Sequence, residues 1–274
     1  MAVGSTRSPT KSPLRPDDLP GHLELPEENG EFVQNFRELP QCIQLSQSLW
    51  PILEVLHPDK QFALGHDCGI YWRLTDPPER GVVCPDWFYV SGVPPDLDGH
   101  YRRSYVLWKE LIAPSVILEF ASDHGEFERD ATPLEGKYWI YEKAVHGGYY
   151  GIFVVETGDL EVYRLEADRY QKLAPNAGGR YLIESLGVEL GVWQGEFFNI
   201  DAPWLRWFDR KGNLLPMGEE LAVQEHRRAE EAIRRAEEER KRAEDERKRA
   251  EEESLRAERL AAKLRELGVD PSAI

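Results

Sequence analysis

A short apolar run with one acid inside it, Pro114 to Ala121, is the feature that most constrains the fold of this chain. Val116 to Leu118 are β-branched or bulky and follow soon after a proline, which is typical of a strand buried on both faces. Glu119 lies within this run. An ionised carboxylate costs several kcal/mol to remove from water unless it is paired, hydrogen-bonded or bound to a cation. Glu119 therefore requires a partner elsewhere in the chain.

A second acid, Asp86, lies in a similar setting. Val82 to Val90 is predicted to be another apolar strand, with Asp86 as its one acid, although Asp86 taken alone is more typical of a turn at the end of a strand. Two carboxylates on neighbouring strands can converge on one divalent cation, and hard oxygen ligands suit Mg²⁺. Asp67, beside a predicted core strand, and Glu54, on a predicted helix over Pro40 to Leu56, are further acids that could join such a site.

A predicted helix downstream of Glu119 carries a basic side chain and a tyrosine. Thr132 to Glu135 has the residues of a helix start, and the helix is expected to run to about His146. Lys137 and Tyr141 are four residues apart and so share one face of it. An ammonium group beside a metal site can orient a water molecule and stabilise negative charge that develops on a phosphate.

Each of these residues also has a simpler interpretation. Glu119 could form an ion pair with Arg102 or Arg103 and bind no metal. Lys137 could be an ordinary solvated lysine, and Tyr141 could belong to the apolar core. The order of the residues, an acid in each of two strands followed by Lys-x-x-x-Tyr on the next helix, favours a joint function.

That order resembles a known family. Pro85-Asp86, Leu118 to Ser122, Gly136 to Glu142 and Tyr149 to Phe153 are similar to the Uma-two family of restriction endonucleases, within the PD-(D/E)XK nuclease superfamily. The resemblance covers roughly residues 35 to 212. It implies an α/β fold, a restriction-endonuclease-like core with a mixed central β-sheet flanked by helices. It also implies hydrolysis of nucleic-acid phosphodiester bonds with Mg²⁺, or with Mn²⁺ in its place.

Carried over by position, the resemblance makes Asp86 and Glu119 the metal ligands and Lys137 the catalytic lysine. In the superfamily pattern the lysine lies two residues after the second acid, and here Ala121 stands in that place. Lys137 would have to reach the same space from the following helix. The expected activity is that of an Mg-dependent endonuclease acting on DNA more readily than on RNA. The alternative is a catalytically degenerate nuclease-like domain that serves as an interaction or scaffold protein.

The C-terminal part of the chain differs in composition. Residues 235–241, 242–248 and 249–255 read RAEEERK, RAEDERK and RAEEESL, which is a seven-residue repeat. Ala occupies one heptad position and Glu often follows three residues later, so the apolar seam of a coiled coil is poor. We expect a long charged helix over 218–267, either a solvated single helix or a weak coiled coil that makes the protein a homo-oligomer.

The distribution of charge restricts the way in which nucleic acid can bind. Gly218 to Leu267 carries 16 acidic and 14 basic residues, so it holds −2 of the formal net charge of −16 and the remainder holds −14. A broad electrostatic attraction of DNA phosphates to the folded part is then unfavourable. Contacts with nucleic acid must use local basic clusters or bound cations.

The remaining expectations concern the domain boundaries and the cellular location. We expect a disordered tail over 1–30, the endonuclease domain over 31–212 and a C-terminal tail over 268–274. No apolar run has the length of a membrane span, and three cysteines without a CxxC pair argue against a disulfide framework. We therefore expect a cytoplasmic protein without membrane contacts.

Overall fold

A computed structural model describes residues 19–21, 24–25, 36–97, 99–122 and 124–266. The disordered tail expected over 1–30 lies mostly outside these residues, and the tail expected over 268–274 lies wholly outside them. The chain forms two compact units, Met1–Met217 and Gly218–Ile274.

A six-stranded mixed sheet forms the centre of the first unit. In spatial order its strands are β1 (Phe62–His66), β4 (Trp87–Ser91), β6 (Val116–Ala121), β7 (Tyr149–Val154), β8 (Asp159–Glu166) and β9 (Arg169–Lys172). β6 and β7 run parallel, and the other neighbouring pairs are antiparallel. Every residue of β6 is buried, as expected for a strand with a partner on each side and a layer on each face. The predicted α/β fold with a mixed central sheet is confirmed.

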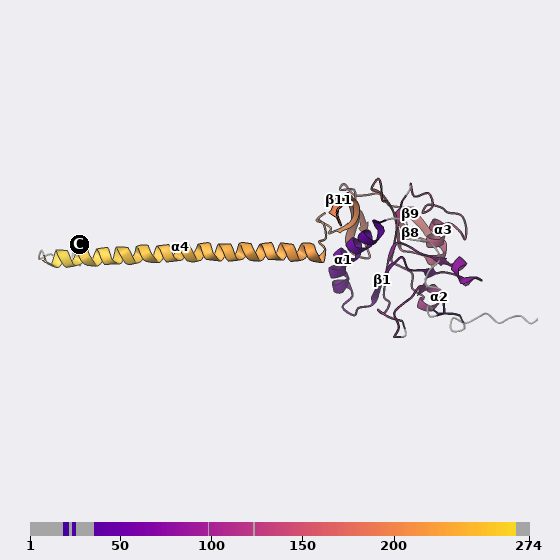
Figure 1. The fold of residues 1–274 in the computed structure, drawn as a ribbon, viewed down its shortest axis with the longest axis horizontal. Helices are drawn as coiled ribbons and strands as arrows, with labels where there is room; N and C mark the ends of the chain where they lie inside the picture. The colour runs from indigo at the N-terminus through magenta and orange to yellow at the C-terminus, as the bar shows by residue number, and fades with distance from the viewer. Residues whose placement is uncertain (1–18, 22–23, 26–35, 98, 123, 267–274) are drawn as a thin grey trace, which may run out of the picture. The chain divides into compact units, whose positions relative to one another are not determined.

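One face of the sheet packs against the first helix and a second sheet. These elements are α1 (Glu38–Leu56) and the antiparallel strands β10 (Tyr181–Ile183), β11 (Val188–Phe197) and β12 (Ile200–Phe208). Val116, Leu118 and Phe120 of β6 point toward this face, because side chains alternate along a strand. In Figure 1, α1 and β11 lie toward one side of this unit and α3 toward the other.

The other face carries shorter elements. They are α3 (Lys137–Trp139), the π-helical segment η3 (Ile140–Val145), the 3-10 turn η2 (Pro78–Gly81), α2 (Leu107–Glu110), and a small sheet of β3 (Val82–Val83), β2 (Ile70–Tyr71) and β5 (Tyr105–Val106). Ile117 and Ala121 of β6 pack on this side with Ile140 and Tyr141 of η3. Alternation along β6 therefore directs Glu119 toward η3.

The first helix follows its apolar periodicity. Leu45, Leu49 and Leu53 are fully buried, at the spacing of one helical face. The helix predicted over Pro40 to Leu56 is confirmed, but it begins two residues earlier, at Glu38.

The strand predicted over Val82 to Val90 is interrupted. Val82–Val83 form β3 of the small sheet, whereas Trp87–Ser91 form β4 of the central sheet. Pro85 lies between them, and proline cannot donate a backbone hydrogen bond to a ladder. Asp86 therefore immediately precedes a strand instead of lying within one.

The helix start predicted at Thr132 is wrong. The backbone N–H and the hydroxyl of Thr132 both donate to Asp130 Oδ1, at 2.8 and 2.6 Å, which holds this segment in a turn. The helix begins at Lys137, after Gly136. Its end agrees with the prediction, since His146 caps it in the left-handed conformation with φ 57°.

The second unit contains one long charged helix, α4 (Gly218–Glu266). Ion pairs four residues apart lie along it, for example Glu244 with Lys248 at 3.0 Å, as expected for a solvated helix. No helix in the described ranges is both long enough and apolar enough to cross a membrane.

Candidate metal and catalytic site

Asp86 is fixed at the point where the ladder between β4 and β6 ends. The last register pair at this end joins Trp87 to Leu118. Beyond it, the carboxylate Oδ2 of Asp86 accepts a short hydrogen bond from the backbone N–H of Phe120. The side chain of Asp86 thereby continues the ladder, and its carboxylate is held beside Glu119.

Both carboxylate oxygens of Glu119 are hydrogen-bonded. Lys137 Nζ donates to Oε2 at 2.9 Å, and the hydroxyl of Tyr141 donates to Oε1 at 2.5 Å. The Glu119 side chain is only 1% exposed, so these two donors replace the water that it loses. The alternative in which an arginine neutralises Glu119 is not the arrangement found, and Arg102 pairs with Glu110 instead.

A local helical distortion brings Lys137 and Tyr141 to Glu119. The residue before α3 is Gly136, and a side chain does not fit there because a Cβ would lie 2.1 Å from the carbonyl oxygen of Asp130. Lys137 is the first residue of α3, and Tyr141 lies four residues later in η3. The shared face predicted from their spacing agrees with their common partner. Single π-helical segments of this kind are frequent at functional sites.

A second group of acids gathers around Asp86. Glu38, Asp67 and Asp86 each offer a carboxylate oxygen, and these oxygens lie within 4.8 Å of one another. The backbone carbonyl of Asp86 holds the group together, since it accepts hydrogen bonds from Cys42 Sγ and from the N–H of Asp67, each at 3.3 Å. Cys42 is one helical turn after Glu38 on α1, so both face Asp86. Asp67 follows β1 with φ 51°, a conformation that aspartate tolerates better than most residues.

The donors in this group fit a hard divalent cation. Carboxylate oxygens are the ligands that Mg²⁺ prefers, and Mg²⁺ usually keeps several water molecules. Glu38 is buried, Asp86 is half-buried and Asp67 is exposed, so the group opens to solvent on one side. Water and ions can therefore reach the group from the side of Asp67.

The residues predicted for the site fall into three sets. Asp86, Glu119 and Lys137 are brought together, and Asp67 joins Asp86 in the carboxylate group. Glu54 lies elsewhere, because it is exposed and 16 residues after Glu38 on the same helix, about 24 Å along its axis.

Glu38 was missed at the sequence level, where it fell in the segment before the predicted helix. A usable signal exists, because Glu38 precedes Cys42 by four residues and Leu45 by seven. These spacings place it on the buried stripe of α1. An acid on the apolar stripe of a helix is as informative as an acid in an apolar strand.

The site favours a proton on Asp86 unless a cation takes its place. Burial raises the pKa of Asp86 well above its ordinary value, the negative charge of Glu119 raises it further, and Lys137 opposes both. Burial alone would lower the pKa of Lys137, but Glu119 and Asp86 outweigh that effect and raise it, so the ammonium stays charged. Burial and Glu119 raise the pKa of Tyr141, which therefore remains a hydrogen-bond donor.

Comparison with known proteins identifies the family of the chain. The family model described as “Uma2: Putative restriction endonuclease” matches residues 17–201, more than half of the 274-residue chain. No curated protein matches the chain. The matched range contains α1, β1, β4, β6 and α3, and with them every acid of the site and Lys137. The chain therefore belongs to the Uma2 family.

Proposed function

We propose that this protein is a metal-dependent endonuclease that hydrolyses phosphodiester bonds of nucleic acid, DNA more readily than RNA. The observation that carries the proposal is the carboxylate group of Glu38, Asp67 and Asp86, within 4.8 Å of one another, beside the buried pair of Glu119 and Lys137. Membership of a family described as restriction endonucleases supports the same class of reaction.

Glu38, Asp67 and Asp86 would hold Mg²⁺ or Mn²⁺. Bound there, the metal supplies a Lewis acid for the phosphoryl oxygen and lowers the pKa of a coordinated water molecule. Glu119 is the further ligand that the family resemblance implies. Its charge raises the pKa of Asp86, so the two carboxylates are electrostatically coupled, but Glu119 is not one of the three acids whose oxygens lie within 4.8 Å of one another.

Lys137 is the proposed catalytic lysine. Its ammonium stays charged and is oriented by Glu119 at 2.9 Å, and its side chain is 14% exposed. A preorganised cation in this position can orient the attacking water molecule and stabilise negative charge on the phosphate. Tyr141 positions Glu119 from the opposite oxygen and so limits the movement of Lys137.

The competing proposal is a degenerate domain that acts as a scaffold, with α4 as a homo-oligomerising element. Two features favoured it, the net charge of −14 outside the C-terminal segment and the displaced lysine. The displaced lysine no longer argues for a degenerate site, because Lys137 contacts Glu119. We therefore place the nuclease first. A cytoplasmic location fits the three cysteines, none of which is joined in a disulfide in the described part of the chain.

The test is cleavage by the full chain. Supercoiled plasmid, single-stranded DNA and RNA are incubated with wild type in Mg²⁺, in Mn²⁺ and in a chelator. Lys137→Met is expected to lower the rate by about 10²–10³-fold, the usual cost of removing one preorganised donor. Asp67→Asn changes an exposed acid and tests the carboxylate group without threatening the core.

The matched control is Lys143→Met. Lys143 lies on η3, which continues the helix that Lys137 begins. It pairs with Glu142 at 3.1 Å, away from Glu119. This variant should cleave at the wild-type rate. Cleavage of none of the three substrates, or equal cleavage by wild type and both site variants, overturns the proposal. Circular dichroism of each variant establishes that it is folded.

A further inference from the structure

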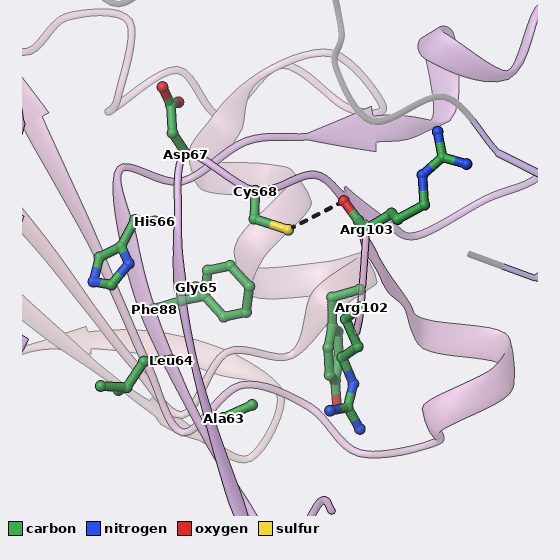
Figure 2. A pocket seen from close by; sticks show the side chains of 10 residues that line it. Ala63, Leu64, Gly65, His66, Asp67, Cys68, Phe88, Arg102 and Arg103 are labelled. Atoms are coloured by element: carbon green, nitrogen blue, oxygen red, sulfur yellow. Dashed lines mark hydrogen bonds between the residues drawn. The ribbon is translucent and has the colours of Figure 1, made fainter. Parts of the chain in front are cut away.

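A groove runs from the candidate metal site along the free edge of β1. Its volume is about 390 Å³, and its walls are Ala63–Cys68 on one side and Arg102, Arg103 and Tyr105 on the other. Asp67 belongs both to this groove and to the carboxylate group. Figure 2 shows the ring of Phe88 between the two walls, with Asp67 and Cys68 near one end. The groove therefore connects Asp67 to the neighbouring arginines Arg102 and Arg103.

Arg102 braces the second wall. Its Nε and Nη2 donate to the two carboxylate oxygens of Glu110 at 2.7 and 3.0 Å, and its Nη1 donates to the carbonyl of Pro94 at 2.6 Å. Its side chain is 9% exposed. A bidentate, largely buried ion pair of this kind fixes geometry, so Arg102 holds the segment in place.

The residues on either side of Arg102 face solvent. Tyr101 is 91% exposed, and Arg103 is also exposed. The backbone beside them is tied to the residues that follow Asp67, because Cys68 Sγ donates to the carbonyl of Arg103 at 3.6 Å and the N–H of Tyr105 donates to the carbonyl of Gly69 at 2.8 Å. An exposed aromatic ring and an exposed basic side chain thus lie on a braced segment, and Arg103 lines the same groove as Asp67.

We propose that Tyr101 and Arg103 form a contact site for a single nucleic-acid strand. Arg103 binds a backbone phosphate, and Tyr101 stacks on an unpaired base. The residues outside 218–267 carry a net charge of −14, which repels phosphates. A local cation is therefore needed to hold a phosphate near the carboxylates. Exposed aromatic rings beside basic groups are the usual means of binding unstacked bases.

The orientation of the side chains decides which phosphate Arg103 contacts. In Figure 2 the guanidinium of Arg103 points away from the carboxylate of Asp67, and Cys68 lies between them. Arg103 is therefore placed for a phosphate that flanks the one at the acids. Because stacking on Tyr101 needs an unpaired base, the substrate class is single-stranded or locally unpaired nucleic acid. This inference rests on the proposed function for its choice of nucleic acid.

Equilibrium binding separates this inference from catalysis. A fluorescently labelled single strand and the matching duplex are titrated with the full chain in Ca²⁺, and the strand is checked afterwards for cleavage. Arg103→Ala should reduce the slope of log K against log salt on the single strand by about 0.7, the loss of one phosphate contact. Tyr101→Ala should weaken single-strand binding by about 5- to 150-fold, whereas Tyr101→Phe retains the wild-type affinity.

Two control variants make the same chemical change elsewhere. Arg169→Ala removes an exposed arginine from β9, at the opposite edge of the central sheet from β1, and Phe198→Ala removes an aromatic residue that is 61% exposed. Both should bind as wild type does. An unchanged salt slope for Arg103→Ala, or equal losses for Tyr101→Ala and Phe198→Ala, overturns the inference. Wild-type binding with these losses but without cleavage supports the contact site and overturns only the proposed hydrolysis.

Discussion

Acidic side chains are frequent along α4 and also surround Asp86, but the two groups differ in their exposure to water. In α4 the pair Glu244 and Lys248 is 54% and 60% exposed, so each charge is hydrated and its partner is replaceable. Glu119 is 1% exposed, and each of its oxygens is bonded to one particular side chain. The number of acids in a segment therefore says little about its chemistry. Removal of an acid from water is what forces a specific partner.

The largest effect is expected from breaking the buried pair. Lys137→Met leaves Glu119 buried with Tyr141 as its remaining donor, and an uncompensated buried charge costs about 3–5 kcal/mol. The free energy of unfolding, measured by urea titration, should fall by this amount. The double variant Lys137→Met/Glu119→Gln should recover much of the loss, because it removes both charges.

Lys143→Met is again the comparison, because the side chains of Lys143 and Glu142 are 31% and 13% exposed, against 14% and 1% for Lys137 and Glu119. If Lys137→Met costs no more than Lys143→Met, the Glu119 pair behaves as a more exposed pair does. The buried charge of Glu119 would then depend on its partner no more than the exposed charges of α4 do.

An intermediate effect is expected from Mg²⁺. A cation that binds only the folded protein stabilises it by about 2.7 kcal/mol at 100 times its dissociation constant. Asp67→Asn should abolish most of the rise in melting temperature that Mg²⁺ produces, whereas Asp245→Asn, the same change on exposed α4, should leave it intact. Equal shifts in both variants would assign the effect to nonspecific screening of the acidic chain.

The pH dependence of the same measurement has a definite sign. The pKa of Asp86 is raised above its ordinary value of 3.8 in the folded protein. Without metal, protonated Asp86 contributes stability that is fully present below that ordinary value and is lost as pH rises through the raised pKa. Mg²⁺ competes with this proton, so stabilisation by Mg²⁺ should grow as pH rises across the same interval. Asp86→Asn should remove both trends.

Sequence reasoning succeeded where one local pattern was enough. A continuous apolar run identified β6, and burial required a partner for Glu119. The four-residue spacing of Lys137 and Tyr141 placed both on one face, and both contact Glu119. These inferences needed only the period of a helix or strand and the cost of burying a charge.

It failed where a contact outside the helical or strand period decided the outcome. The capping signal at Thr132 lost to Asp130, whose carboxylate takes both donors of Thr132. Glu38 enters the site because Cys42 attaches α1 to the backbone of Asp86, a packing that local periodicity does not show. Asp67, which its place beside a core strand makes a candidate in the sequence, joins the carboxylate group through a left-handed turn after β1.

The smallest effect is expected from α4. A double-mutant cycle on Glu244 and Lys248 should give a coupling energy of about 0.2–0.5 kcal/mol, the usual value for a solvated pair four residues apart, and salt should reduce it. Far-UV circular dichroism of the full chain at several protein concentrations provides the measurement. A coupling above about 1 kcal/mol that resists salt and grows with protein concentration would mean that association shields these charges from water. The helix would then be an oligomerising coiled coil, and its acids would resemble those around Asp86 more than those of a solvated single helix.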